Sequence, residues 1–288
     1  MRLNGRRESS NVEDRRGRSG IGGKIAGGSI VGVIIAAVIA WISGGNPLDV
    51  ITSQGGAMLQ GGANTEYVAT EEDEALATFS KQILAGTEDV WSEIFRQNGM
   101  EYRPPKLVLF NGAVQSGCGG ATSSTGPFYC SADQSVYLDL SFFKDMKRTL
   151  GADGDFAYAY VIAHEVGHHV QYLLGTLDKA HDRMARVSEK EANQISVRLE
   201  LQADFYAGVW AANDNRRFNS LEAGDVEEAL DAASKIGDDY LQKKAQGYSV
   251  PDSFNHGTSE QRARWLKRGL STGNPADGDT FTPDYYSL

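Results

Sequence analysis

The feature of this sequence that most constrains its fold is an uncharged apolar run, IAGGSIVGVIIAAVIAWI, at residues 25–42. Eighteen residues in a helix extend about 27 Å, close to the ~30 Å hydrocarbon core of a bilayer. Trp41 lies at the far end of the run, where an aromatic ring suits the membrane interface. We therefore expect one transmembrane helix here. A cleaved signal peptide would normally have a shorter apolar region and a shorter charged lead than 24 residues.

Charge is distributed unevenly around this run. Residues 1–24 contain seven Lys or Arg and three Asp or Glu, whereas the whole chain has a formal net charge of -10. A basic segment beside a membrane span normally stays in the cytoplasm. The sequence thus predicts a single-pass protein of the bacterial inner (plasma) membrane, with residues 1–24 cytoplasmic and the larger part extracytoplasmic (periplasmic). Because that part is acidic, nucleic acid is not an expected partner. The Gly28-x-x-x-Gly32 spacing could pair two spans in a homodimer.

The rest of the chain divides into a linker and one folded domain. Residues 43–70 contain three Gly-Gly pairs and little apolar periodicity, which predicts a Gly-rich linker. From residue 71 to residue 288 the composition is that of a folded domain. It opens with apolar residues at helical spacing, and KLVLF at 106–110 and VYLDL at 136–140 indicate short strands.

The segment DFAYAYVIAHEVGHHVQYLLG at 155–175 predicts a helix that carries a metal-binding motif. His164 and His168 are four residues apart, so both imidazoles lie on one helix face and can bind one ion. Glu165, next to the first histidine, is placed to take a proton from a metal-activated water. We predict His164 and His168 as metal ligands and Glu165 as the catalytic base.

A second helix is expected to supply the third ligand. Ser188, with Glu191 three residues later, forms a capping box that marks the start of a helix through SEKEANQISVRLELQADFYAGVW. Glu200 and Asp204 share a face of that helix. We predict Glu200 as a ligand, and Asp204 as the acceptor that fixes the tautomer of a ligand histidine. The alternative is a solvated acidic stripe, which the surrounding apolar residues disfavour.

These motifs resemble those of known metallopeptidases. The HEXXH motif, followed by Glu200-x-x-x-Asp204, looks like the gluzincin class, and the ELQAD wording is similar to CAAX-prenyl-protease and HtpX-type enzymes. A more specific resemblance covers nearly the whole chain. The segments RRESSNVEDRR, GPFYC, HEVGHHVQ, ELQADFYAGVW and FNHGTSEQRARW resemble the bacterial neutral zinc metallopeptidase family. The resemblance implies an α+β fold, namely a mainly helical zincin-like domain with a small β-sheet, and one Zn2+ ion as cofactor.

His256 is the remaining histidine of interest. It lies six residues before Arg262, a spacing similar to that in HtpX-type enzymes. The resemblance implies that His256 is catalytic and donates to the oxyanion that water attack creates. The alternative is a surface histidine near a helix start, with Arg262 in a structural salt bridge. Two neighbouring acids, Asp238 and Asp239, are interpreted as polar surface.

Cys118 and Cys130 flank a Gly/Ser/Thr-rich stretch and predict a disulfide in an oxidising compartment; two unrelated buried thiols are the alternative.

The function expected is a membrane-anchored, zinc-dependent peptidase that acts on a peptide or protein substrate. Strand 136–140 is expected to offer a sheet edge to that substrate. Two alternatives stay open. One is a peptide-deformylase-like hydrolase with Cys118 as a thiolate ligand. The other is a non-catalytic membrane scaffold with a closed, structural zinc site.

Overall fold

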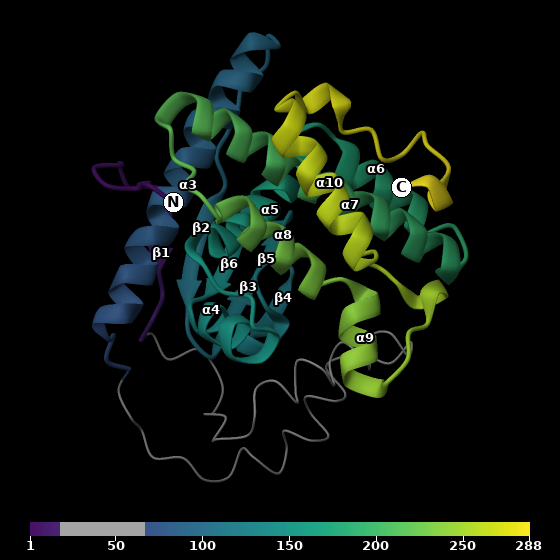
Figure 1. Cartoon of the computed structure of the whole chain (residues 1–288), viewed down its shortest axis with the longest axis horizontal. Helices are drawn as coiled ribbons and strands as arrows, with labels where there is room; N and C mark the ends of the chain where they lie inside the picture. Colours follow the sequence, from purple (N-terminus) through teal and green to yellow (C-terminus); the bar gives the residue numbers. More distant parts are fainter. Residues whose placement is uncertain (18–66) are drawn as a thin grey trace.

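The structure is a computed structural model that describes residues 1–17 and 67–288 (Figure 1). The apolar run at 25–42, its Gly28/Gly32 pattern and most of the predicted linker lie outside the described residues. Within the described part of the chain, no helix is both long enough and apolar enough to span a bilayer.

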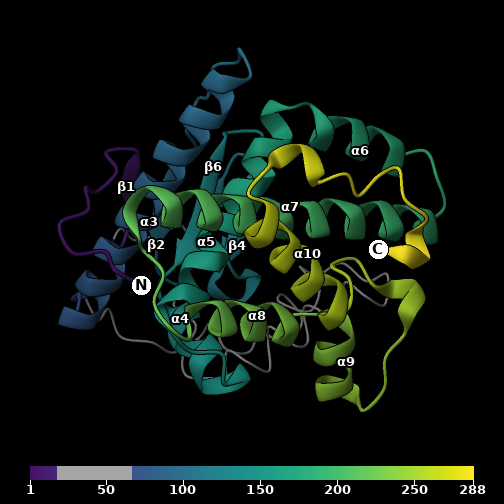
Figure 2. The ribbon, with the colours of Figure 1, turned by 45° about the horizontal axis from the view of Figure 1, so that its top comes forward.

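Helices dominate the domain and surround a small sheet, as Figures 1 and 2 show. The mainly helical α+β prediction is confirmed. The helices are α3 (Glu71–Gln97), α4 (Ser141–Asp145), α5 (Asp155–Leu173), α6 (Thr176–Met184), α7 (Glu189–Phe218), α8 (Asp225–Lys235), α9 (Asp238–Gln246) and α10 (Ser259–Thr272). The strands are β1 (Val12–Asp14), β2 (Lys106–Phe110), β3 (Ala113–Ser116), β4 (Gly119–Thr122), β5 (Phe128–Cys130) and β6 (Ser135–Asp139).

The main sheet has the strand order β1-β2-β6-β5, and β3 and β4 form a separate antiparallel hairpin. Strands β1, β2 and β6 are parallel, whereas β5 is antiparallel to β6. The expectation that the 136–140 strand offers a free edge is wrong, because β6 is paired on both sides. Among the described strands, β5 stands at the end of the sheet opposite β1 and has one partner, β6.

The sheet is buried on both faces, which explains the continuous apolar run KLVLF in β2. Leu107 and Leu109 join the main core with the helices, while Val108 and Phe110 pack against the β3–β4 hairpin. Because successive side chains of a strand point to opposite faces, one apolar run can serve both clusters.

Close helix crossings bring together the segments that carry the predicted motifs. A Cβ atom on Gly167 of α5 would lie 2.9 Å from the carbonyl oxygen of Ala203 in α7. A Cβ atom on Gly269 of α10 would lie 2.0 Å from the carbonyl oxygen of Phe205. Real Cβ atoms do not approach backbone oxygens so closely, so these glycines permit α5, α7 and α10 to pack with their backbones nearly touching.

The N-terminal seventeen residues are packed on the domain. In the sequence they belong to a predicted cytoplasmic segment, 1–24, separate from the domain. In the structure β1 is an edge strand of the main sheet, and the segment runs beside α3 (Figures 1 and 2). Sequence analysis missed β1 because the triplet VED has no apolar pattern.

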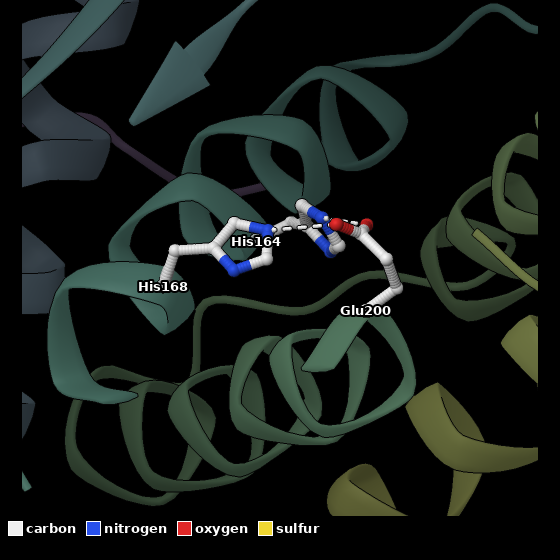
Figure 3. Close-up of side chains that lie close together, drawn as sticks. All are labelled: His164, His168 and Glu200. Carbon is white, nitrogen blue, oxygen red and sulfur yellow. Dashed lines mark hydrogen bonds and ion pairs between the residues drawn. The ribbon is translucent and has the colours of Figure 1, made fainter. Parts of the chain in front are cut away.

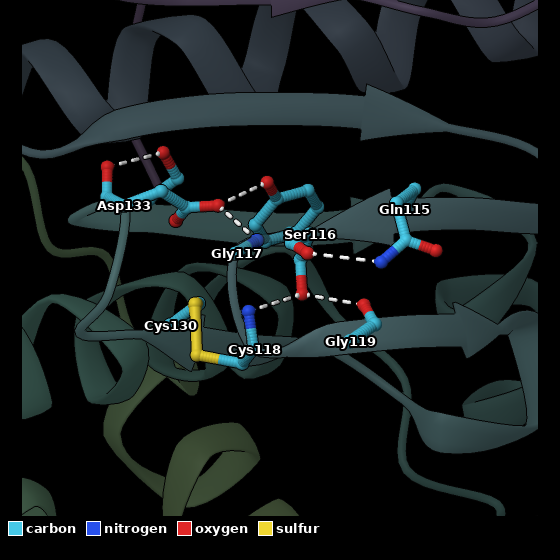
Figure 4. Close-up of a disulfide and its surroundings, with 9 residues drawn as sticks. Gln115, Ser116, Gly117, Cys118, Gly119, Cys130 and Asp133 are labelled. Carbon is cyan, nitrogen blue, oxygen red and sulfur yellow. Dashed lines mark hydrogen bonds between the residues drawn. A yellow bond between two sulfur atoms is a disulfide. The ribbon is translucent and has the colours of Figure 1, made fainter.

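Cys118 and Cys130 form a disulfide with a Cα–Cα distance of 5.8 Å (Figure 4). It joins the start of β4 to the end of β5. Asp133 stabilises the turn beside it by accepting hydrogen bonds from the Gly117 amide at 2.7 Å and from the Tyr137 hydroxyl at 2.7 Å.

Candidate metal centre

Helix α5 presents His164 and His168 on one face, as their spacing predicts. The helix is buried along most of its length, and the side chains of His164 and His168 are 8% and 14% exposed. The two rings lie perpendicular to each other, with their centroids 4.8 Å apart. Both imidazoles thus lie close together and are largely shielded from water.

Glu200 of α7 faces this histidine pair (Figure 3). Its Oε2 lies 3.1 Å from Nε2 of His164, and its Oε1 lies 3.4 Å from Nε2 of His168. One ligand atom from each of the three residues lies within 4.8 Å of the other two. Residues more than 30 positions apart in the sequence, on two different helices, are therefore brought together as three potential ligands.

The spacing of these atoms fits a tetrahedral zinc ion. Two ligand atoms about 2.05 Å from an ion, at the tetrahedral angle, are roughly 3.3 Å apart. The 3.1 and 3.4 Å separations between the carboxylate and the two rings bracket that value. His164, His168 and Glu200 therefore fit such an ion, with one carboxylate oxygen near each ring.

The other nitrogen of each ring is already hydrogen-bonded. Nδ1 of His164 lies 2.8 Å from Oδ1 of Asp204, and Nδ1 of His168 lies 2.9 Å from Oε1 of Gln171. Both partners accept, so each Nδ1 carries the proton and each Nε2 is left to bind the metal. Asp204 is thus the acceptor for a histidine ring nitrogen, as its spacing from Glu200 predicts. Gln171 was not singled out from sequence.

Asp204 is fully buried and is shared by three donors. The Tyr160 hydroxyl donates to Oδ1 at 2.5 Å, and Arg262 of α10 donates to both carboxylate oxygens at 2.9 Å. Arg262, for which a structural salt bridge was one interpretation of the sequence, forms that bridge with Asp204. The buried guanidinium balances the carboxylate that orients His164, which a buried charge requires.

The charges around His164 and Glu200 strongly shift the pKa values of these two side chains. Burial would lower the pKa of His164, but the carboxylates of Asp204 and Glu200 outweigh burial and raise it to about 10. Burial would raise the pKa of Glu200, but His168 and His164 hold it well below its usual value. Glu200 is therefore ionised, the form in which a carboxylate binds a metal.

Glu165 is 8% exposed, next to His164 on α5. Among the described residues no hydrogen bond or ion pair engages its carboxylate. A buried carboxylate without a protein partner has its oxygens available for a water molecule. This is the arrangement that a general base beside a metal needs.

His256 lies in the loop before α10, close enough for its charge and that of Glu200 to act on each other. Asp238, at the start of α9, holds this loop. Its Oδ2 accepts from the amides of Asn255, His256 and Gly257 at 2.8, 2.7 and 3.0 Å. Its Oδ1 lies 3.1 Å from Nδ1 of His256. The interpretation of Asp238 as polar surface is wrong, because the residue is 2% exposed.

Gln171, Tyr160 and Asp238 are the functional candidates that sequence reasoning missed. Gln171 had a detectable signal, because it follows His168 by three positions and so shares its helix face. Tyr160 precedes His164 by four positions and had the same signal. Asp238 had none, because its contact with His256 depends on how α9 meets the loop.

Cys118 does not contribute to this centre. Its sulfur is bonded to Cys130, and Glu200 supplies the third ligand position. The deformylase-like alternative, which needs a Cys118 thiolate on the metal, is therefore wrong.

The fold and the site define an α+β protein whose two packed helices form a candidate centre for a divalent metal. The chain belongs to the family described as "Putative neutral zinc metallopeptidase", whose model matches residues 1–281. The family implies zinc as the metal.

Relatives of this chain include the uncharacterized protein YpfJ of Escherichia coli (strain K12), 50% identical over 287 residues. That match covers 98% of this chain and 99% of YpfJ. The uncharacterized protein Rv2575 of Mycobacterium tuberculosis is 41% identical over 191 residues, covering 63% of this chain and 64% of its own. No solved structure matches this chain.

Proposed function

We propose that this protein is a zinc-dependent peptidase in which His164, His168 and Glu200 hold the metal and Glu165 is the general base. The observation that carries the proposal is the three-ligand geometry beside an unpaired, largely buried carboxylate. A bound zinc supplies Lewis-acid activation of water and of the scissile carbonyl. Glu165 takes the proton of the attacking water and delivers it to the departing amine.

His256 stabilises the negative oxygen that forms on the substrate carbonyl. Its Nδ1 is held by Asp238, so Nε2 is the nitrogen that would donate to the substrate. Asp238 and Glu200 raise the pKa of His256 against the opposing effects of burial and Arg262. The protonated ring then keeps an N–H on Nε2, which donates to the oxyanion.

An extended peptide pairs with β5, which has β6 as its one partner among the described strands and which contacts α5. Tyr129 in this strand is held by the buried His169, whose Nδ1 lies 2.9 Å from the Tyr129 hydroxyl. His169 Nε2 donates to the carbonyl of Arg103, so the tyrosine is the donor in the first contact. The strand is thereby fixed relative to the helix that carries the metal ligands, as strand addition of a substrate requires.

A purely structural zinc site is the competing function. Such a site is closed by four protein ligands, whereas a catalytic site keeps one position open. Around His164 the described residues offer three His, Cys, Asp or Glu ligands, which favours the catalytic reading. Membrane anchoring through residues 25–42 and an extracytoplasmic location stay predictions from the sequence.

The test is zinc analysis of the purified full chain together with cleavage of a peptide library by the wild type and by Glu165→Gln. The full chain is needed because residues 1–17 are part of the fold. Glu165→Gln should keep one zinc per chain and lose about 10²–10⁴-fold in turnover. A Glu165→Gln enzyme as active as the wild type would exclude the mechanism.

A further inference from the structure

The N-terminal segment, residues 1–17, is bonded into the main sheet through its backbone. Val12 and Glu13 of β1 pair in parallel register with Leu107 and Val108 of β2. The ladder continues beyond the strand, because the amide of Arg15 donates to the carbonyl of Leu109 at 2.8 Å. A three-residue polar strand is weak by itself, so side-chain contacts must hold it in place.

One set of these contacts engages Glu88 of α3, which is 7% exposed. The hydroxyl of Ser9 donates to Oε1 at 2.5 Å, and the side-chain amide of Asn11 donates to the same oxygen at 2.8 Å. Arg7 donates to Oε2 at 2.9 Å. Three residues of the N-terminal segment thus donate hydrogen bonds to this buried carboxylate. Without the segment, the carboxylate would be buried without these three donors.

A second set engages α7, the helix that carries Glu200. Arg6 binds both carboxylate oxygens of Asp214, at 2.6 and 3.2 Å, and the Asp214 side chain is 1% exposed. A Cβ atom on Gly86 of α3 would lie 3.0 Å from both the Arg6 guanidinium and the Asp214 carboxylate. Gly86 therefore leaves room for this ion pair between α3 and α7.

Gly17, the last residue of the first described segment, lies beside Tyr67, the first residue of the second. A Cβ atom on Gly17 would lie 3.4 Å from the ring of Tyr67. A helix that crosses a bilayer once separates its two ends by about 30 Å. Contact between residues 17 and 67 is therefore incompatible with an odd number of membrane crossings between them.

We propose that residues 1–17 are a fixed part of the domain that carries the metal centre, and that they lie on the same side of the membrane as that domain. Residue 17, where the first described segment ends, and residue 67, where the second begins, then lie on one side of the membrane. This excludes the arrangement in which the N-terminal segment is cytoplasmic and the domain is outside. The proposal does not depend on the proposed peptidase activity.

The basic residues that suggested a cytoplasmic N-terminus have another role in this arrangement. Arg6 pairs with Asp214, Arg7 with Glu88 and Asp89, and Arg16 with Asp14 and Glu74. These guanidinium groups hold the segment on the domain. Arg6 and Arg7, and Arg16 through Glu74, thus have partners on the domain, so these three charges do not require a cytoplasmic segment.

The first experiment measures sidedness with single cysteines in the full chain. Glu8→Cys reports on the N-terminal segment and Met100→Cys on the domain, at positions whose native side chains are 46% and 43% exposed. The native cysteines are bonded to each other, so each variant has one free thiol. Intact spheroplasts and lysed cells are treated with a membrane-impermeant maleimide.

Both positions should be labelled in intact spheroplasts, or both should be protected until lysis. Labelling of one position with protection of the other, in protein that melts at the wild-type temperature, would overturn the proposal.

The second experiment measures whether the segment is bound as tightly as its contacts indicate. Arg6→Ala leaves the Asp214 carboxylate buried and unpaired, and should lower Tm of the full chain by roughly 10 °C. Arg2→Ala is the matched control, because Arg2 and its partner Glu222 are both about half exposed, and should shift Tm by less than about 2 °C.

The double variant Arg6→Ala/Asp214→Ala separates this ion pair from a general loss of stability. Its Tm should lie above the value expected from adding the two single shifts, since no unpaired charge remains. An Arg6→Ala protein with unchanged Tm, or strictly additive shifts, would show that the segment is not held by this pair and would overturn the proposal.

Discussion

The carboxylate of Asp238 accepts two hydrogen bonds from His256, one from the backbone amide at 2.7 Å and one from ring Nδ1 at 3.1 Å. The orientation of the proposed oxyanion donor is thus set by the first residue of α9. His164 and His168 are held in the same manner, by Asp204 and Gln171. Each histidine of the proposed site thus has its Nδ1 held by an acceptor.

The contact between Gln171 and His168 predicts a role in metal affinity. Gln171→Leu removes the acceptor for Nδ1 of His168, so the ring loses its fixed tautomer. Loss of such a partner typically weakens metal binding about 10–100-fold, which competition with a chromogenic chelator would measure. Gln171→Glu retains an acceptor for Nδ1 but loses the donation of the Gln171 amide to the carbonyl of Leu199, so its zinc affinity should lie between those of Gln171→Leu and the wild type.

Gln97→Leu, at an exposed position of α3, is the control for the loss of a glutamine. Equal zinc affinities for Gln171→Leu and Gln97→Leu would contradict the role given to Gln171.

The disulfide between Cys118 and Cys130 predicts a stability difference between oxidised and reduced protein. It joins β4 to β5 across a sequence separation of 12, and Cys130 is fully buried. Its reduction, or the Cys118→Ser/Cys130→Ser replacement, should lower the free energy of unfolding by about 2–4 kcal/mol. Denaturant titrations with and without reductant would measure it. Identical midpoints would mean that the bond does not form in the protein as expressed.

Sequence reasoning found those parts of the site whose geometry is local. His164 and His168, and likewise Glu200 and Asp204, are each four residues apart on one helix, so helix periodicity alone puts them on a common face. The structure shows that α5 and α7 cross beside them, where Gly167 meets Ala203. Asp238 could not be found, because its acceptor role depends on a loop 18 positions away folding back over α9.

The fold was predictable to a similar extent. The long apolar helix α5 and the apolar strand β2 have patterns that reveal them. Strand β1 has no such pattern, and its partner lies some 90 residues further along the chain. The residues RRESSNVEDRR suggested a separate charged tail, because a sequence does not show that a distant Glu88 and Asp214 neutralise those arginines.

His256 is predicted to act on the transition state rather than on substrate binding. His256→Ala removes the proposed oxyanion donor, so kcat should fall about 10²–10³-fold, while KM and zinc content stay near the wild-type values. Steady-state kinetics on a defined peptide, with zinc analysis of the same samples, measures all three. A loss confined to KM would instead make His256 a substrate-binding residue.

Asp238→Asn is predicted to change the pH dependence of that same step. In the wild type, Asp238 keeps the proton on Nδ1, so the ring donates from Nε2 only while it is an imidazolium. The pKa of His256 is raised by Asp238 and by Glu200, against burial and Arg262. The donor is therefore fully present below the ordinary histidine pKa and is lost as the pH rises through the raised value. Wild-type kcat should fall on that alkaline limb.

In Asp238→Asn the amide oxygen can still accept from the three loop amides, and the amide nitrogen then faces Nδ1 of His256. Nδ1 becomes an acceptor, and the neutral ring carries its proton on Nε2, so a weaker donor persists at all pH values. We expect kcat of Asp238→Asn to be lower than that of the wild type and to fall less at alkaline pH. A plot of kcat against pH measures both effects. Asp239→Asn is the matched control, since Asp239 accepts from Ser259 and not from the ring. An alkaline limb of unchanged position and depth in Asp238→Asn would assign that limb to another group and remove the imidazolium from the mechanism.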